Sequence, residues 1–123
     1  MILILDTDHL TIIQRKTEPA HSRLRARLGA FPQEDVRTTI VSFEEQMRGW
    51  LSTIARSRTG DRQVAAYERL HDLLVFFGAI PVSRYDDDAS AGFAALRRLR
   101  LRIGSMDLKV AAIVLSQNGL SAV

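Results

Sequence analysis

The stretch ILILDTD at residues 2–8 decides the fold class. Residues 2–5 form a short, continuous apolar run, which is typical of a strand buried on both faces. The Asp-Thr-Asp that follows ends this run and predicts the start of a helix, with Thr7 or Asp8 as its N-cap. A buried strand that leads directly into a helix favours a parallel sheet covered by helices.

The same alternation continues along the chain. A β-branched segment from Thr38 to Val41 predicts a second buried strand, and Ser42 is expected to cap the next helix, with Glu45 completing a capping box. Together these patterns predict one domain over residues 1–123, a three-layer α/β/α fold with a short central parallel sheet. The remaining expected elements are strands at 79–82 and 120–123 and helices at 18–29, 62–77, 86–104 and 106–117.

Composition narrows the possible functions. The 123 residues contain no cysteine, which excludes disulfides, thiolate nucleophiles and cysteine-based zinc sites. No secretory signal and no membrane span is visible, so we expect a soluble, cytoplasmic protein. The 17 Lys+Arg exceed the 14 Asp+Glu and give a net charge of +3, which permits a polyanionic partner without requiring one.

Three carboxylates stand where an α/β fold places its ligands, beyond the carboxyl ends of the strands. Asp6 follows the first strand, Glu45 lies in the first turn of the helix after the second strand, and Asp107 begins a late helix. Carboxylates brought together repel one another, and a divalent cation such as Mg²⁺ or Mn²⁺ would remove that conflict. Each acid also has a purely structural interpretation, as a strand end, a capping-box partner or a charge at a helix N-terminus.

Three segments resemble a known family. LDTDHL at residues 5–10 resembles the opening strand and turn of PIN-domain proteins, and SFEEQMRG at 42–49 resembles their second motif, in a register that favours Glu45 over Glu44. IGSMDLKVAA at 103–112 resembles the family's small-residue loop, Asp107 and the alanine-rich helix that follows. The likeness extends over nearly the whole chain and is closest to the toxin ribonucleases of the VapC type.

This resemblance implies an endoribonuclease that cleaves RNA with Mg²⁺ or Mn²⁺. Asp6, Glu45 and Asp107 would be catalytic metal ligands, directly or through water, and Thr7 would shape the site with its hydroxyl. Such toxins usually form homodimers and are held inactive by a small antitoxin protein. The family continues past its last strand to a further acid, whereas residues 120–123 fall where that strand starts, so a final strand extension and acidic motif are expected to be missing.

Two alternatives remain open at this point. A shortened, catalytically weak or inactive PIN-domain protein could serve as an antitoxin-binding or dimerisation module. A phosphatase could use Asp6 as nucleophile and Asp8 as acid, since Asp-x-Asp after a first strand also marks the haloacid-dehalogenase class.

Arginines are the candidate RNA contacts. Arg48 lies one turn after Glu45, and Arg98 and Arg100 belong to a basic cluster before Asp107. They could bind phosphates that flank the acidic site, or simply form a solvated helix face. Trp50 and Phe43 are interpreted as core or dimer contacts rather than as platforms for base stacking.

Overall fold

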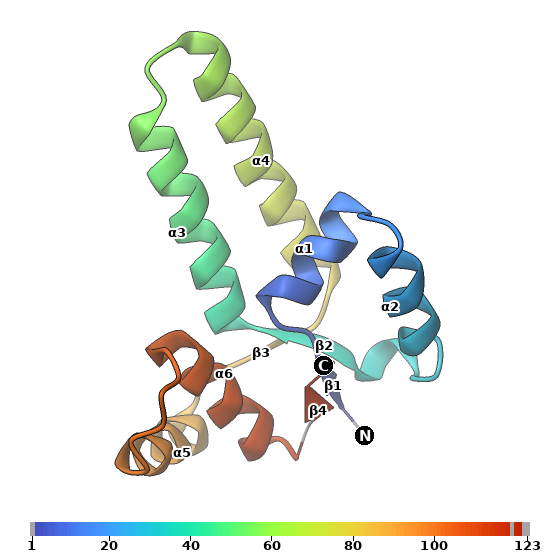
Figure 1. Ribbon diagram of the computed structural model, residues 1–123, viewed down its shortest axis with the longest axis vertical. Helices are drawn as coiled ribbons and strands as arrows, with labels where there is room; N and C mark the ends of the chain where they lie inside the picture. Colours follow the sequence, from blue (N-terminus) through green and yellow to red (C-terminus); the bar gives the residue numbers. More distant parts are fainter. Residues whose placement is uncertain (1, 119, 122–123) are drawn as a thin grey trace.

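The computed structural model describes residues 2–118 and 120–121 of the chain. Its strands form a parallel sheet in the order β3-β2-β1-β4, so the first strand is central (Figure 1). In chain order the elements are β1 (Leu3–Ile4), α1 (Thr7–Arg15), α2 (Ala20–Leu28), the 3₁₀ turn η1 (Gln33–Asp35), β2 (Val36–Thr39), α3 (Ile40–Arg56), α4 (Gly60–Ala79), β3 (Val82–Ser83), α5 (Asp87–Arg98), α6 (Ser105–Ser116) and β4 (Leu120–Ser121).

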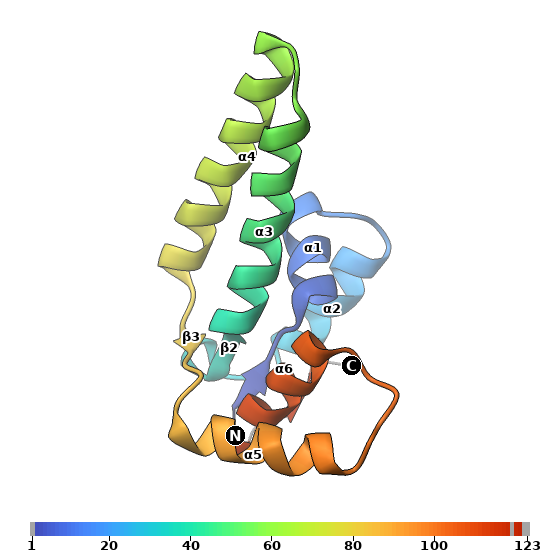
Figure 2. The same cartoon turned by 90° about the vertical axis from the view of Figure 1, so that its left-hand side faces the viewer.

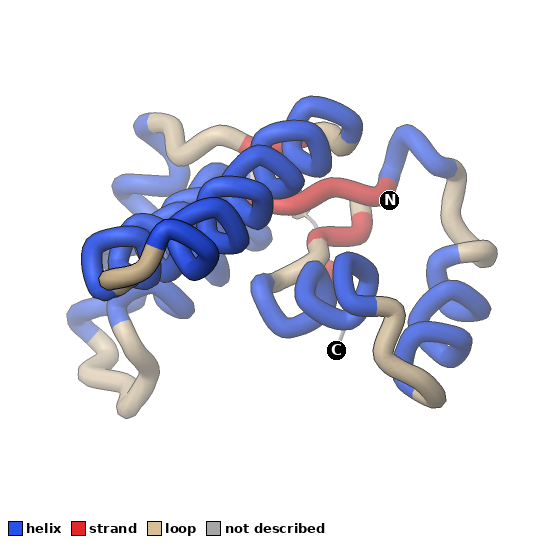
Figure 3. Tube along the Cα trace, turned by 90° about the horizontal axis from the view of Figure 1, so that it is seen from above, coloured by secondary structure: helices blue, strands red, loops and turns tan. Residues whose placement is uncertain are grey.

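The alternation of side chains along β1 builds two cores. Leu3 and Leu5 face one side and pack with Leu10 of α1, against apolar side chains from α2 and α4. Ile4 faces the other side and packs with Ala89 of α5 and Ile113 of α6. Successive residues of a strand point to opposite faces, so one short segment organises both layers. The strands lie between the helices (Figure 3), which confirms the predicted three-layer fold.

Buried hydroxyls tie the strand ends together. The Thr38 hydroxyl donates to the Leu5 carbonyl at 3.0 Å, and the Leu5 N–H donates to the Arg37 carbonyl at 2.7 Å. The Ser83 hydroxyl donates to Gln117 Oε1 at 2.7 Å and so joins β3 to the end of α6. Because buried polar groups are costly unless paired, these bonds fix how the strands align at their carboxyl ends.

Helices α3 and α4 form a long antiparallel pair that extends well beyond the sheet (Figures 1 and 2). Helix α3 also packs against α1, which belongs to one helical layer, and against α6, which belongs to the other. It therefore contacts both layers. Phe43 of α3 meets Phe77 of α4 edge-on, with 5.0 Å between the ring centroids, as expected of a core contact. None of the described helices is both long enough and apolar enough to cross a membrane.

The start of α3 differs from the sequence prediction. The second strand is Val36–Thr39 rather than Thr38 to Val41, and α3 already begins at Ile40. Thr39 caps this helix by accepting the Ser42 N–H at 3.0 Å, so Ser42 is not the cap and the predicted capping box is wrong. The early start follows because the buried Thr39 hydroxyl satisfies a helix N–H at the point where the strand ends.

The start of α1 was also predicted wrongly. Asp6 is the N-cap, rather than Thr7 or Asp8, and its Oδ1 accepts the His9 N–H at 3.0 Å. An aspartate in extended conformation is among the best helix caps, which explains the choice.

Two later boundaries shift as well. The helix predicted over 86–104 ends at Arg98, because Arg100 adopts a left-handed conformation with φ of 51° and turns the chain away. The third strand begins at Val82 instead of 79, since α4 continues to Ala79. The fourth predicted strand is present as Leu120–Ser121, and the rest of that prediction, residues 122–123, lies outside the described residues.

Removing the buried Thr38 hydroxyl should destabilise the fold. Thr38→Val keeps the side-chain shape but leaves the buried Leu5 carbonyl without this donor, so we expect the free energy of unfolding to fall by about 1–3 kcal/mol. Urea denaturation followed by circular dichroism measures the change. The exposed Thr17→Val is the matched control, and an equal effect of both substitutions would contradict the role of Thr38.

Candidate functional site

The sheet topology brings three helix starts to one edge. Helices α1 and α3 follow the neighbouring parallel strands β1 and β2, so both begin at the carboxyl edge of the sheet. Helix α6 runs back before the parallel strand β4, and therefore also begins near this edge. The first turns of α1 and α6 overlap in the projection of Figure 2, and both helices pack against α3. Asp6, Glu45 and Asp107 thus belong to the three elements that start there.

Asp6 is held in place by the helix that it caps. Its Oδ1 accepts the His9 N–H, and His9 Nδ1 lies 2.6 Å from the same oxygen without the alignment of a hydrogen bond. The Asp6 side chain is 37% exposed, whereas that of His9 is 16% exposed. One face of the carboxylate is therefore fixed by local structure while part of it stays accessible to a ligand.

Thr7 and Glu45 meet across two helices. The Thr7 hydroxyl donates to Glu45 Oε2 at 3.1 Å, which joins α1 to α3 next to Asp6. Neighbouring Glu44 is instead occupied by Arg48, whose Nη2 lies 2.7 Å from Glu44 Oε2. Glu44 is thus paired on its own helix, and Glu45 is the glutamate that contacts α1.

Asp107 stands in the first turn of α6. It is exposed, and the adjacent Leu108 is buried and anchors the helix. Helix α6 packs against α3, which also carries Glu45. Among residues 2–118 and 120–121, however, no three histidine, aspartate or glutamate side chains lie close enough together to hold a metal ion between them.

The donor set still suits a hard cation. Asp6, Glu45 and Asp107 offer carboxylate oxygens, and within the described residues neither Glu45 nor Asp107 is neutralised by an ion pair. Mg²⁺ retains several waters and is commonly held through only one or two carboxylates, so a tight group of three acids is not required. Direct ligation by one or two of these acids, with water linking the remainder, is compatible with this arrangement.

The predicted arginines occupy different surroundings. Arg48 is paired with Glu44, as described above, so its charge is partly engaged. Arg98 ends α5, and Arg100 follows it in the left-handed turn; both are exposed on the segment that leads to Asp107. Asp8, the acid of the phosphatase alternative, is exposed in the first turn of α1.

One feature of the site was not predicted from the sequence. The Gln14 and Gln46 side-chain amides exchange two hydrogen bonds, at 3.1 and 3.3 Å, between α1 and α3. Gln14 lies two helical turns after Thr7, and Gln46 directly follows Glu45. Only the packing of α1 on α3 shows that the two glutamines meet.

The sheet order, the two helical layers and the helix starts at the carboxyl edge define a PIN-like α/β domain. Solved structures with this fold include VapBC-1 from nontypeable Haemophilus influenzae (TM-score 0.69, 16% identity, covering 98% of this chain and 84% of that chain) and FitAcB from Neisseria gonorrhoeae (0.65, 22%, 98% and 85%). VapBC-5 of Mycobacterium tuberculosis, a member of the VapBC family of toxin–antitoxin systems, is also similar (0.56, 20%, 98% and 83%).

These likenesses confirm the resemblance to VapC-type proteins in fold. No family model and no curated protein matches the sequence. At identities of 16–22%, the structural neighbours fix the fold, and the roles of individual residues rest on the geometry of this chain.

The capping role of Asp6 can be tested apart from any activity. Asparagine caps helices about as well as aspartate, whereas alanine cannot accept the His9 N–H, so Asp6→Ala should unfold about 0.5–2 kcal/mol more easily than Asp6→Asn. Chemical denaturation in buffer containing EDTA compares the two variants. Equal stabilities would show that the cap is unimportant.

Proposed function

We propose that this chain is a metal-dependent endoribonuclease of the toxin–antitoxin type. The observation that carries the proposal is the Thr7–Glu45 hydrogen bond beside Asp6, at the carboxyl edge of a VapC-like sheet. It links two acid-bearing segments at the place where such folds bind their ligands. Asp107, in the first turn of α6, would complete the set from a helix that also packs against α3.

In this proposal Asp6, Glu45 and Asp107 hold Mg²⁺ or Mn²⁺, directly or through water. When bound, the cation would activate a water for attack on an RNA phosphodiester and offset the negative charge that develops on its oxygens. Thr7 positions Glu45 through its hydroxyl, and the N-cap bond fixes Asp6. Arg98 and Arg100, with Arg48 to a lesser degree, would bind phosphates on either side of the cleaved bond.

The proposal includes partners. Because the similar structures are toxin–antitoxin assemblies, we expect a small antitoxin protein to bind and inhibit this chain in the cytoplasm. A homodimer is expected as well. Large apolar side chains exposed on the α3–α4 pair offer surface for such contacts: Leu51, Val64, Tyr67, Leu74 and Val75.

Removal of single carboxylates tests the nuclease. Asp6→Asn and Asp107→Asn each delete one ligand charge while keeping the shape, so RNA cleavage in Mn²⁺ should disappear. Asp61→Asn is the matched control, because Asp61 lies in the first turn of α4. Helix α4 starts at the end of the helical pair that is distant from the sheet (Figure 1), so this variant should cleave normally. Gel analysis of a panel of labelled RNAs gives the measurement. Full activity in both site variants would overturn the assignment.

A substitution at Thr7 distinguishes the positioning of Glu45 from direct binding of the metal. Thr7→Val removes the hydroxyl that holds Glu45, so cleavage should fall by about 10–100-fold, and higher Mn²⁺ should restore part of it. Rates measured across a Mn²⁺ series, with the exposed Thr17→Val just after α1 as the control, provide the comparison. A Thr7→Val protein with an unchanged Mn²⁺ dependence would contradict this role.

The competing function is a non-catalytic binding module. The absence of a tight acidic triad among the described residues is the observation in its favour. A folded wild-type protein that cuts none of the RNAs in Mn²⁺, yet forms a stable complex with a partner encoded beside it, would establish this function instead.

A further inference from the structure

Trp50, the single tryptophan of the chain, borders three adjoining cavities. They have volumes of about 670, 390 and 280 Å³ and lie between α1 and α4, between α3 and α4, and between α1 and α3. They adjoin one another, since each pair also shares a further lining residue (Gln14, Arg69 or Thr53), and we call the three together the Trp50 groove. It runs from Thr7 past Gln14 and Trp50 to Arg62.

The Trp50 groove is strongly basic. Its charged lining consists of Arg15, Arg56, Arg62 and Arg69, against a single acid, Asp72. Arg69 Nη1 lies 3.5 Å from Asp72 Oδ2, but both side chains are more than 60% exposed, so this pair is weak. Within the described part of the chain, the other three arginines have no acidic partner. Four guanidinium groups in one depression favour a polyanion.

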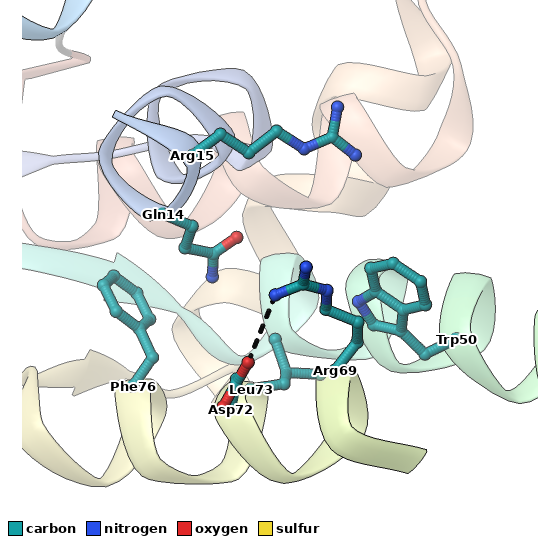
Figure 4. Close-up of a pocket in the computed structure, with 7 residues that line it drawn as sticks. All are labelled: Gln14, Arg15, Trp50, Arg69, Asp72, Leu73 and Phe76. Atoms are coloured by element: carbon teal, nitrogen blue, oxygen red, sulfur yellow. Dashed lines mark hydrogen bonds and ion pairs between the residues drawn. The ribbon is translucent and has the colours of Figure 1, made fainter. Parts of the chain in front are cut away.

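The ring of Trp50 narrows the kind of polyanion that the groove would bind. It is half-buried, and Figure 4 shows Arg69 between Trp50 and Asp72, with Arg15 extending from α1 above them. The remaining lining includes hydroxyls and amides, among them Thr11, Gln14 and Thr53. Arginines beside a partly exposed aromatic ring, with neutral hydrogen-bonding groups around them, match the phosphates and bases of an unpaired strand better than an apolar helix.

The Trp50 groove is continuous with the candidate site. Thr7, which donates to Glu45, lines its inner end. The hydrogen-bonded Gln14 and Gln46 follow, and then Trp50. The lining of the Trp50 groove therefore extends from Arg62 past Trp50 to Thr7, whose hydroxyl contacts Glu45 of the candidate site.

We infer that the Trp50 groove binds single-stranded RNA, with one base stacked on Trp50 and its phosphates on the surrounding arginines, and leads the strand to the acidic site. This inference rests on the proposed function and specifies its substrate as unpaired RNA. It also gives Trp50 a different role from the core or dimer contact that the sequence suggested.

The fluorescence of Trp50 reports binding directly, because no other tryptophan contributes. Asp6→Asn protein in EDTA, which cannot cleave, is titrated with a single-stranded oligoribonucleotide of about eight residues. We expect saturable quenching that weakens as salt rises. The same RNA in a perfect duplex, or a polyglutamate peptide of equal charge, should quench far less. Quenching by polyglutamate equal to that by RNA would assign the groove to an acidic protein segment and overturn the inference.

Variants identify the contacts. Trp50→Leu should lower the affinity for labelled single-stranded RNA by about 5- to 100-fold in fluorescence anisotropy, and Trp50→Phe should restore most of it, because a ring remains for stacking. Arg62→Gln with Arg69→Gln should reduce the slope of log affinity against log salt by about 1.4, at roughly 0.7 for each phosphate that is no longer neutralised. The two arginine changes are on an exposed surface and should leave the fold intact.

Arg23→Gln with Arg25→Gln on α2 removes the same charge away from the groove and should leave the slope nearly unchanged. If both arginine pairs change the slope equally, or if Trp50→Leu binds as tightly as the wild type while remaining folded, the groove inference fails.

The two proposals fail separately. If the wild-type protein binds RNA at Trp50 but cleaves no RNA, the proposed nuclease activity is contradicted and the assignment of the Trp50 groove stands. If cleavage is lost in Asp6→Asn but unchanged by substitution of Trp50 and the groove arginines, the nuclease proposal stands and RNA binding in the Trp50 groove is refuted.

Discussion

The structure depends on the alignment of β1 with β2, fixed where both strands end. The Thr38 hydroxyl and the Leu5 carbonyl form a buried hydrogen bond, and the adjacent Leu5 N–H pairs with Arg37. Asp6 comes directly after Leu5, and α3 begins directly after Thr39. A shift of one residue between these strands would turn the side chains of β1 to the wrong faces and separate Thr7 from Glu45. One short stretch of parallel pairing thus sets both cores and the candidate site.

Helix capping carries this alignment into the site. Asp6 and Thr39 each accept a backbone N–H three residues later, so α1 and α3 both start at the sheet edge. The beginnings of the two helices are then close enough for Thr7 to reach Glu45, and further along α1 Gln14 meets Gln46 of α3. The same helical pair continues into the Trp50 groove. The part of the Trp50 groove between α1 and α3 therefore adjoins the candidate site, whereas most of its arginines lie on α3 and α4.

Asp6 illustrates why structural and functional interpretations need not compete. The sequence left open whether it ends a strand, starts a helix or binds a metal. In the structure it caps α1 through Oδ1 and remains partly exposed, so its local role fixes the carboxylate that a cation would use. Glu45 shows the opposite outcome, since its expected capping role is absent and its carboxylate faces Thr7 instead. The early start of α3 at Ile40 releases Glu45 for that contact.

The sequence by itself determined the alternation of strands and helices, the parallel sheet and the likeness to VapC-type proteins, because apolar runs and local motifs are formed by neighbouring residues. It placed the helix starts imprecisely, because the N-cap depends on where each strand ends. The sequence predicted Thr7 or Asp8 and Ser42 as caps, whereas Asp6 and Thr39 cap the two helices. Only the tertiary structure decided that Glu45 meets Thr7, and that arginines from α1, α3 and α4 gather around Trp50. Those contacts join residues tens of positions apart, and helix packing, which no local pattern encodes, brings them together.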